Sequence, residues 1–259
     1  MKTMHVVQIS GGKDSQACAK LVRERNPDAH IVGIFCDTQY EHQWTYAHVE
    51  RVAELYNLEL VTLNAGSVES EVTKWGRFPG GGARHCTEYL KIKPAKDWLI
   101  AKAIKTGGKI INYIGVRADE SPERTKRYGG YDASLIMPHE FMPSKYPKYM
   151  GDKLGIRYCT PIVEWSSGDV FTYLDGEHNP LYDNGFSRVG CFPCLAGGDK
   201  EKGRAFNFDS TGRKHYEIAK KLEAITVASG NKPLFNTKIG AKIECGLDNS
   251  GAGCAFCSI

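Results

Sequence analysis

His5-Val6-Val7-Gln8-Ile9-Ser10-Gly11-Gly12-Lys13-Asp14-Ser15 is the stretch that decides the fold. Residues 5–9 form a short apolar run typical of a buried strand, and a helix is predicted from about Asp14 to Arg25. Two glycines between them let successive N–H groups point at an anion, and the helix N-terminus adds its positive end. The turn has neither the spacing of a Walker loop nor that of a dinucleotide-binding fold. It predicts a phosphate-binding loop of another kind.

The side chains of this loop suit phosphate chemistry. Ser10 and Ser15 can donate hydroxyl protons to phosphate oxygens, and Lys13 supplies a positive charge. Asp14 can hold Mg²⁺ against a leaving pyrophosphate. A plain strand-to-helix turn with a serine cap would need neither the lysine nor the aspartate. We therefore expect Lys13 and Asp14 to be catalytic, and the following residues to bind a nucleotide: Ser10, Gly11, Gly12, Lys13, Asp14 and Ser15.

Outward from this loop, predicted strands and helices alternate. Further strands are predicted at about residues 30–36, 58–63, 109–116 and 158–162. One further helix ends near residue 57, and three others are predicted at about residues 93–105, 166–174 and 213–227. This alternation predicts an α/β fold with a doubly wound, mainly parallel sheet. Residues 68–87 are predicted as a loop, because Phe78-Pro79-Gly80-Gly81-Gly82 cannot hold regular structure.

We expect two regions in the chain. Residues 1–178 form the nucleotide-binding α/β domain, with an insertion at about 122–158 that is dense in Tyr, Lys, Pro and Gly. Residues 179–259 form a C-terminal, cysteine-bearing subregion packed on the same core.

Composition narrows the class of protein. The 259 residues carry a net charge of +4, which suits an anionic substrate without requiring nucleic acid. No apolar run approaches the roughly 20 residues of a membrane helix, and no signal peptide is recognisable. We therefore expect a cytoplasmic protein that does not engage a membrane. In that compartment most of the nine cysteines should be metal ligands, nucleophiles or core residues rather than disulfides.

Two C-x-x-C pairs predict a metal site. They are Cys191-Phe192-Pro193-Cys194 and Cys254-Ala255-Phe256-Cys257. Thiolates at this spacing chelate a tetrahedral metal or two corners of an iron–sulfur cluster. The spacing alone leaves an iron–sulfur cluster, zinc and no metal as open alternatives. Cys18, Cys36 and Cys159 fall in predicted helix or strand positions and are expected in the core.

The loop resembles the PP-loop of N-type ATP pyrophosphatases, which cleave ATP between the α and β phosphates and adenylate a substrate. Other motifs are similar to the phosphoadenosine phosphosulfate (PAPS) reductase-like branch of that superfamily. They are Asp37-Thr38, residues 84–94, Gly115-Val116-Arg117-Ala118-Asp119-Glu120-Ser121 with Arg124, residues 161–170, Pro180-Leu181-Tyr182 with Gly185, and residues 188–194. The resemblance spans about residues 5–205 and implies the adenine nucleotide alpha hydrolase-like (HUP) fold. It implies nucleotide contacts at Asp37, Thr38, Gly115, Arg117, Glu120, Arg124 and Arg188.

The resemblance also implies a 4Fe–4S cluster held by Cys86, Cys191, Cys194 and a fourth ligand elsewhere. Cys254 and Cys257 are the further ligands that we expect, with Cys245 as a competitor. Glu244-Cys245-Gly246 is similar to the C-terminal tail of PAPS reductases, whose cysteine attacks the sulfur of the sulfonucleotide. Cys245 is thus a candidate nucleophile, and a cluster ligand or a buried thiol is the alternative.

These motifs lead to three candidate functions. PAPS reductases proper bind ready-made adenylyl sulfate and as a rule have lost the full Ser-Gly-Gly-x-Asp-Ser loop, which is intact here. The first hypothesis is therefore an ATP pyrophosphatase with Mg²⁺ that adenylates an acceptor and takes part in sulfur transfer, with a donor such as a cysteine desulfurase. It resembles the Dnd- and Ssp-type proteins of DNA phosphorothioation and, more distantly, the tRNA thiolases. The second is a PAPS or adenylyl sulfate reductase served by thioredoxin. The third is a non-catalytic nucleotide-binding or nucleic-acid-binding subunit.

The insertion interleaves cations and aromatic rings, as a surface that binds DNA or tRNA would require. Solvated loop residues would explain the same composition. The residues are Lys126, Arg127, Tyr128, Tyr131, Lys145, Tyr146, Lys148, Tyr149 and Lys153. We also expect a homo-oligomer.

Overall fold

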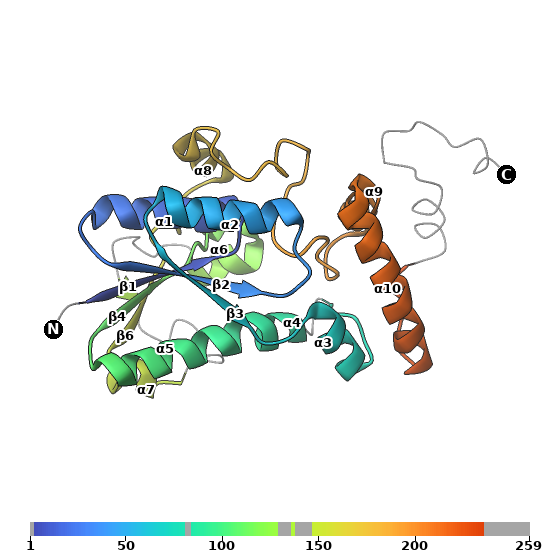
Figure 1. The fold of residues 1–259 in the computed structure, drawn as a ribbon, viewed down its shortest axis with the longest axis horizontal. Helices are drawn as coiled ribbons and strands as arrows, with labels where there is room; N and C mark the ends of the chain where they lie inside the picture. Colours follow the sequence, from blue (N-terminus) through green and yellow to red (C-terminus); the bar gives the residue numbers. More distant parts are fainter. Residues whose placement is uncertain (1–2, 81–83, 129–135, 138–146, 236–259) are drawn as a thin grey trace. The chain divides into compact units, whose positions relative to one another are not determined.

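One mixed sheet organises the first part of the chain, in a computed structural model that describes residues 3–80, 84–128, 136–137 and 147–235. Its strands are β1 (Met4–Ile9), β2 (Ile31–Asp37), β3 (Glu59–Asn64), β4 (Ile110–Tyr113), β5 (Ile136–Met137) and β6 (Ile156–Cys159), in the order β3-β2-β1-β4-β6-β5 (Figure 1). The pairs β1–β2, β1–β4 and β4–β6 are parallel, whereas the two-residue β5 runs antiparallel beside β6. The doubly wound, mainly parallel sheet predicted from the sequence is confirmed.

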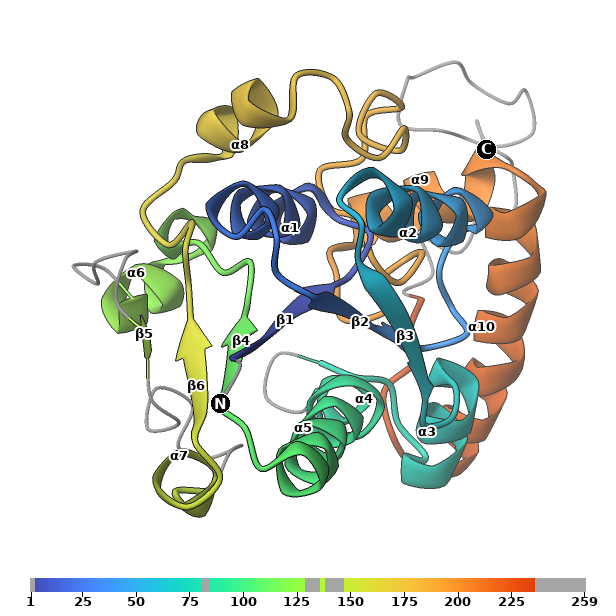
Figure 2. The ribbon, with the colours of Figure 1, turned by 60° about the vertical axis from the view of Figure 1, so that its left-hand side comes forward.

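Helices cover both faces of this sheet. Figure 2 shows α1 (Lys13–Arg25) and α2 (Gln43–Leu55) on one face, and α5 (Lys93–Thr106) and α7 (Tyr149–Asp152) on the other. Two shorter helices, α6 (Pro122–Tyr128) and α8 (Ser167–Leu174), come after the strands β4 and β6. Because parallel strands end at the same edge, this arrangement brings the turns after β1 and β4 together.

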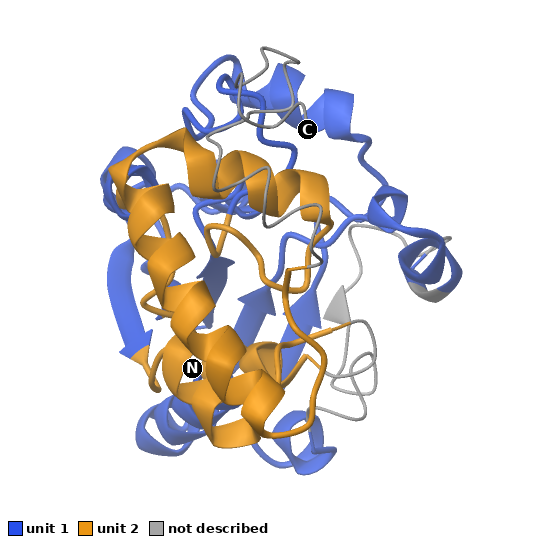
Figure 3. Ribbon diagram, turned by 90° about the vertical axis from the view of Figure 1, so that its right-hand side faces the viewer, with its two compact units in different colours: residues 1–36, 44–63, 92–189 blue, residues 37–43, 64–91, 190–259 orange. Residues whose placement is uncertain are grey.

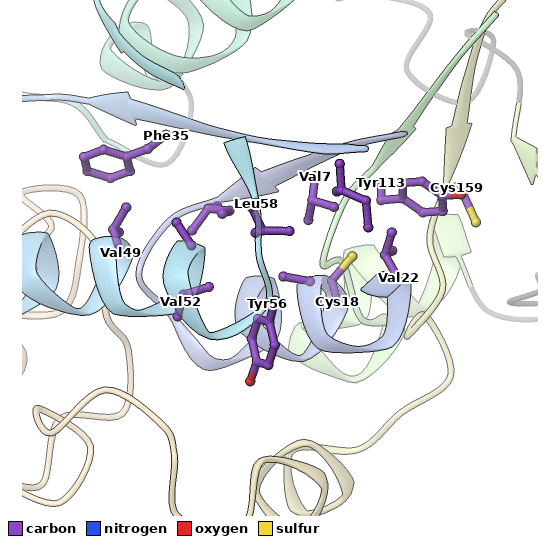
Figure 4. Packing of buried hydrophobic residues seen from close by; sticks show 14 residues of the cluster. Val7, Cys18, Val22, Phe35, Val49, Val52, Tyr56, Leu58, Tyr113 and Cys159 are labelled. Carbon is purple, nitrogen blue, oxygen red and sulfur yellow. The ribbon is translucent and has the colours of Figure 1, made fainter. Parts of the chain in front are cut away.

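The core of the sheet follows the two-residue period of a strand. In β1, Val7 packs with Cys18 and Val22 of α1, whereas Val6 packs on the opposite face with Leu99 of α5. Figure 4 shows the first of these clusters, which also holds Val52 and Tyr56. The expected core positions of the three cysteines are confirmed, since Cys18, Cys36 and Cys159 are 0%, 8% and 4% exposed.

The chain divides into two compact units, coloured separately in Figure 3. Unit 1 holds residues 1–36, 44–63 and 92–189, and therefore the sheet; unit 2 holds residues 37–43, 64–91 and 190–259. Unit 2 contains α3 (Val68–Trp75), α4 (His85–Thr87), α9 (Asp199–Phe208) and α10 (Ser210–Ala228), with a short π-helix, Glu88–Ile92, at its edge. Its own core includes Tyr40, Leu90, Phe206, Tyr216 and Leu222. The predicted domain boundary at residue 178 stays a prediction.

Several predicted elements differ from the observed ones. Residues 68–87 are not one loop: α3 starts at a capping box in which Ser67 and Ser70 exchange backbone and side-chain hydrogen bonds, and ends at the left-handed Gly76. The strand predicted to reach residue 116 ends at Tyr113. The insertion contains α6, α7 and the start of β6, and α9 was not predicted. The helix α8 is capped by Ser166, whose hydroxyl accepts from the Asp169 N–H. No helix within the described ranges is long and apolar enough to cross a membrane.

His48 links α2 to α1 and should make the stability of unit 1 depend on pH. Its Nε2 lies 2.8 Å from the Gln16 Oε1 atom, and burial, with the charges of Arg51 and His178, lowers the pKa of His48 to about 4. The unfolded chain, with a His48 pKa near 6.5, takes up the proton first as the pH falls. The free energy of unfolding should therefore fall between pH 6.5 and pH 4, by at most about 1.4 kcal/mol per pH unit from this group.

Urea unfolding of the wild type and of His48→Gln checks this expectation. The stability advantage of the wild type over the variant should shrink between pH 7 and pH 5. An advantage that stays constant over this range would show that His48 does not titrate as described.

Candidate functional site

The loop between β1 and α1 has a backbone that requires glycine. Gly11 has a φ of 75°, and a Cβ atom there would lie 2.4 Å from the Thr45 Cγ2 atom. Gly12 is the N-cap of α1 with an extended backbone, and no side chain of the described residues caps the helix there. The positive φ and the close approach of Thr45 require glycine at position 11, whereas the extended backbone of Gly12 does not.

The two loop serines bond within the loop. The Ser15 hydroxyl donates to the Gly12 carbonyl at 2.9 Å and accepts from the Ser10 N–H at 3.1 Å. The Ser10 and Ser15 hydroxyl oxygens are 3.1 Å apart. These bonds fix the conformation of the loop. Hydrogen bonds to a bound phosphate would replace some of them.

Asp14 lies between two cations. The Lys13 Nζ atom is 3.0 Å from its carboxylate, and the Arg117 Nε atom donates to it at 2.6 Å. Both cationic side chains are nearly buried, at 6% and 5% exposed, whereas the Asp14 side chain is 22% exposed. A buried charge needs such a partner, so this triad is the electrostatic centre of the loop.

Arg117 is held by more than Asp14. It donates to Asp119 and to the Trp165 carbonyl, and its own N–H donates to the Glu120 carboxylate at 3.1 Å. Glu120 also pairs with Arg124. Burial by itself lowers the pKa of Arg117, but the charges and hydrogen bonds of these carboxylates outweigh it, and the pKa is raised above its ordinary value.

Gly115 sets how closely this network approaches the loop. A Cβ atom at Gly115 would lie 2.5 Å from the backbone oxygen of Asp14 and 2.9 Å from the Ser15 nitrogen. The segment after β4 is therefore pressed against the first turn of α1, and this contact brings Arg117 within reach of Asp14.

Three residues whose contacts the sequence did not predict complete the loop. The Tyr182 hydroxyl accepts from the Lys13 N–H at 3.1 Å, and Asn179 donates to the Gly11 carbonyl at 3.1 Å. Lys13 also lies over the ring of Phe171, with 5.5 Å between its Nζ atom and the ring centroid. Burial raises the pKa of Tyr182 to about 12. Tyr182 belonged to a recognised motif, but no sequence signal showed that it reaches a residue 169 positions away.

Cysteines gather in unit 2. The Cys191 sulfur lies 3.4 Å from the Thr38 hydroxyl and 3.8 Å from the Glu41 carboxylate, which is itself buried. Burial raises the pKa of Cys191 to about 11, with the Glu41 charge adding to the effect. Burial, followed by the neighbouring Cys194, raises the pKa of Cys86. The three thiols that the sequence grouped as ligands therefore share one neighbourhood.

The described residues alone do not complete a metal site. Among them no three His, Cys, Asp or Glu side chains are placed to hold a metal ion. Cys245, Cys254 and Cys257 lie outside the described residues, so the predicted set of ligands stays a prediction. The three soft thiols suit an iron–sulfur cluster or zinc only with ligands from that segment. For Mg²⁺, the single Asp14 carboxylate is the donor that such sites provide beside substrate phosphates.

Comparison with known proteins now gives the family. The model of the phosphoadenosine phosphosulfate reductase domain matches residues 4–196. The chain belongs to this family. The HUP fold that the resemblance implied is confirmed with it.

Three similar proteins illustrate the range of this reductase-domain family. The chain is 29% identical over 288 residues to an uncharacterised 37.8 kDa protein of Escherichia phage 186, covering 90% of this chain and 79% of that protein. It is 28% identical over 220 residues to an adenosine 5′-phosphosulfate reductase of Staphylococcus haemolyticus, covering 80% and 78%. A crystal structure of the PAPS reductase of Candida auris aligns with a TM-score of 0.45 at 18% identity, covering 73% and 81%.

The other predicted residues of this reductase-domain chain are less closely tied to the loop. Among the described residues, Glu120 is the one that links Arg124 to the loop network, and Arg188 is exposed. Asp37 and Thr38 belong to unit 2, so their contact with the nucleotide stays a prediction. In the insertion, Tyr128 is only 5% exposed and packs with Val163, so its ring is not available to stack on a base. Tyr131, Lys145 and Tyr146 lie outside the described residues, and the Arg127 side chain is not described.

Proposed function

We propose that this chain is an ATP pyrophosphatase that adenylates an acceptor and takes part in sulfur transfer. The observation that carries the proposal is the complete loop with Asp14 between Lys13 and Arg117. A reductase that takes ready-made adenylyl sulfate releases no pyrophosphate and has no need of this lysine–aspartate pair. Two buried cations beside a partly exposed carboxylate suit a triphosphate that must lose its β and γ phosphates.

Each side chain has a task in this reaction. The loop backbone and Ser10 hold the phosphates, and Lys13 and Arg117 exchange part of their bonding with Asp14 for phosphate oxygens. An oxygen of the acceptor forms a bond to the α-phosphorus while the bond to the β-phosphate oxygen breaks, and pyrophosphate leaves. Mg²⁺, when bound through Asp14, offsets negative charge on the departing group. A sulfur nucleophile then displaces AMP from the adenylated acceptor.

The proposal extends to cofactor and partners. Cys86, Cys191 and Cys194, with ligands from Cys245, Cys254 or Cys257, would hold the iron–sulfur cluster, whose chemistry when bound is to handle sulfur. Nucleic acid is the acceptor that we propose, with a cysteine desulfurase as the class of sulfur donor, and we propose a homo-oligomer.

A specific observation favours a second candidate. The Staphylococcus haemolyticus relative bears the name of a reductase, and Glu244-Cys245-Gly246 is similar to a reductase tail. In that reaction the Cys245 thiolate would attack the sulfur of adenylyl sulfate, and AMP would leave as the bond from sulfur to its phosphate oxygen breaks. The dithiol of thioredoxin would then reduce the S-sulfocysteine, releasing sulfite and becoming a disulfide.

Pyrophosphate release tests the proposal. Anaerobically purified protein with Mg·ATP should release pyrophosphate, more so with DNA or tRNA, and Lys13→Ala should lose this activity. Sulfite from adenylyl sulfate and thioredoxin, lost in Cys245→Ser and without pyrophosphate from ATP, would establish the reductase instead. Nucleotide binding without either product would indicate a non-catalytic subunit.

A further inference from the structure

An aromatic pair in unit 2, of which Trp75 is exposed and Tyr89 is half-buried, lies outside the loop site. Trp75, the last residue of α3, is 39% exposed. The ring of Tyr89 lies beside it, with 5.8 Å between centroids and 34° between planes. The indole N–H donates to the Glu71 carboxylate at 3.0 Å, so the orientation of Trp75 is fixed. A rigid aromatic ring that remains in solvent is what a stacking partner needs.

Cations surround this pair. The Lys74 Nζ atom lies 4.9 Å from the Tyr89 ring centroid, and the Arg77 guanidinium carbon lies 5.8 Å from that of Trp75. Lys74 is 61% exposed. The buried Glu71 carboxylate accepts from Trp75 and lies 3.8 Å from the Lys74 Nζ atom, so it offsets part of the Lys74 charge and leaves Arg77 as the cation beside the indole.

Arg77 also lines a cavity of about 500 Å³, whose wall includes Lys202 and Lys232. Among the described residues, no carboxylate belongs to this wall. The Lys202 side chain is 7% exposed and pairs with Asp199 at 2.8 Å, whereas Lys232 is exposed. The cavity volume falls within the roughly 300–1,000 Å³ of ligand pockets. An open, cation-lined hollow beside an exposed indole favours an anionic ligand with an aromatic part.

We propose that this surface binds a single strand of nucleic acid. The Trp75 surface, as we name it, consists of Lys74, Trp75, Arg77, Tyr89, Lys202 and Lys232. An unpaired base stacks on Trp75, and flanking phosphates pair with Arg77 and with Lys232 in the cavity. The inference rests on the proposed function, for which it specifies an acceptor with unpaired nucleotides and the surface that holds it. The Trp75 surface takes over the stacking role that the sequence suggested for Tyr128 of the insertion, because the Tyr128 ring is buried.

The arrangement selects among nucleic acids. A base in a duplex has both faces covered by its neighbours, so it could not stack on Trp75. A mononucleotide could fill the cavity but would not use both the indole and Lys74. A single strand of DNA or RNA satisfies the ring and the separated cations together.

Fluorescence anisotropy with labelled single strands of DNA and RNA, each about 12 nucleotides long to match the usual span of such sites, tests the inference on the full chain. Trp75→Ala should weaken binding roughly 5- to 150-fold, as the loss of one stacked base does, without changing the salt dependence. Arg77→Ala and Lys232→Ala should each lower the slope of log affinity against log salt by about 0.7. Trp75→Phe should restore much of the binding. The duplex of the same sequence should bind more weakly than either strand.

Lys102→Ala is the matched control, because Lys102 lies over Trp98 at 5.5 Å in unit 1 and should leave binding unchanged. Circular dichroism of each variant shows whether it is folded. Undiminished binding by folded Trp75→Ala and Arg77→Ala would overturn the inference, as would equal affinity for the duplex.

The outcome for this surface is separate from that for the loop. Asp14→Ala should bind the single strand as the wild type does, whereas Trp75→Ala should lose the increase in pyrophosphate release that the strand causes. Strand binding at Trp75 in a protein that releases no pyrophosphate would refute the proposed function alone. Pyrophosphate release with no Trp75-dependent binding would refute the surface alone.

Discussion

Asp14→Ala should lower the rate of pyrophosphate release about 100- to 1,000-fold, and it should lower the free energy of unfolding by about 3 kcal/mol. The reason for both effects is that Asp14 is the shared partner of Lys13 and Arg117. Without its carboxylate, two side chains that are 6% and 5% exposed keep their charges with less compensation. The variant also loses the donor that we propose for Mg²⁺. Steady-state release of pyrophosphate and urea unfolding measure the two effects.

Asp119→Ala is the matched control for stability. Asp119 pairs with the same Arg117 at 3.0 Å, but its side chain is 56% exposed. Exposed ion pairs contribute about 0–1 kcal/mol, so this variant should be nearly as stable as the wild type. If Asp14→Ala and Asp119→Ala lowered the free energy of unfolding equally, burial of the ion pair would not explain how much Asp14 stabilises the fold. If Asp14→Ala released pyrophosphate at the wild-type rate, the loop would have no catalytic role.

The parts of the fold that the sequence predicted are those governed by local patterns. The helices α1 and α5 and the strands β1 and β2 appear within about two residues of their predicted ends, because apolar periodicity and the turn residues act over short distances. The helix α3 was missed although its Ser67 cap is visible in the sequence. Residues 68–87 were predicted as a loop because of the glycines after Pro79. These glycines come after the C-terminal end of α3 and do not interrupt it.

The sequence predicted which residues belong to the candidate site better than it predicted the contacts between them. The loop motif and the segment after β4 identified Asp14 and Arg117 separately, but their hydrogen bond joins positions 103 residues apart. The bond of Lys13 to Tyr182 spans 169 residues. Contacts of this kind depend on the order of the strands in the sheet. The sequence alone does not give that order, so it does not predict these contacts. The cavity wall that Arg77 shares with Lys232 likewise joins segments of unit 2 that are distant in the sequence.

Gly115→Ala should lower kcat/KM for ATP about 100-fold and cost about 1–3 kcal/mol of stability. The added methyl group would meet the backbone oxygen of Asp14 at 2.5 Å and its carbonyl carbon at 2.7 Å. Backbone atoms cannot rotate away as a side chain can, so the first turn of α1 or the segment carrying Arg117 must move. Either movement shifts the charged side chains that we place on the phosphates. Kinetics with Mg·ATP and thermal unfolding measure the outcome.

Gly168→Ala shows what the same change does where space allows. Gly168 lies in α8, and an added Cβ atom would meet the Ser166 hydroxyl oxygen at 3.6 Å, which is an ordinary van der Waals contact. Alanine in a helix is favoured over glycine by about 0.4–1 kcal/mol, so this variant should be slightly more stable and equally active. A Gly115→Ala protein with wild-type kinetics would mean that the contact between this segment and α1 does not position the site. Loss of activity with unchanged stability would contradict the expected stability loss and would leave the placement of Arg117 and Asp14 as the cause of the lost activity.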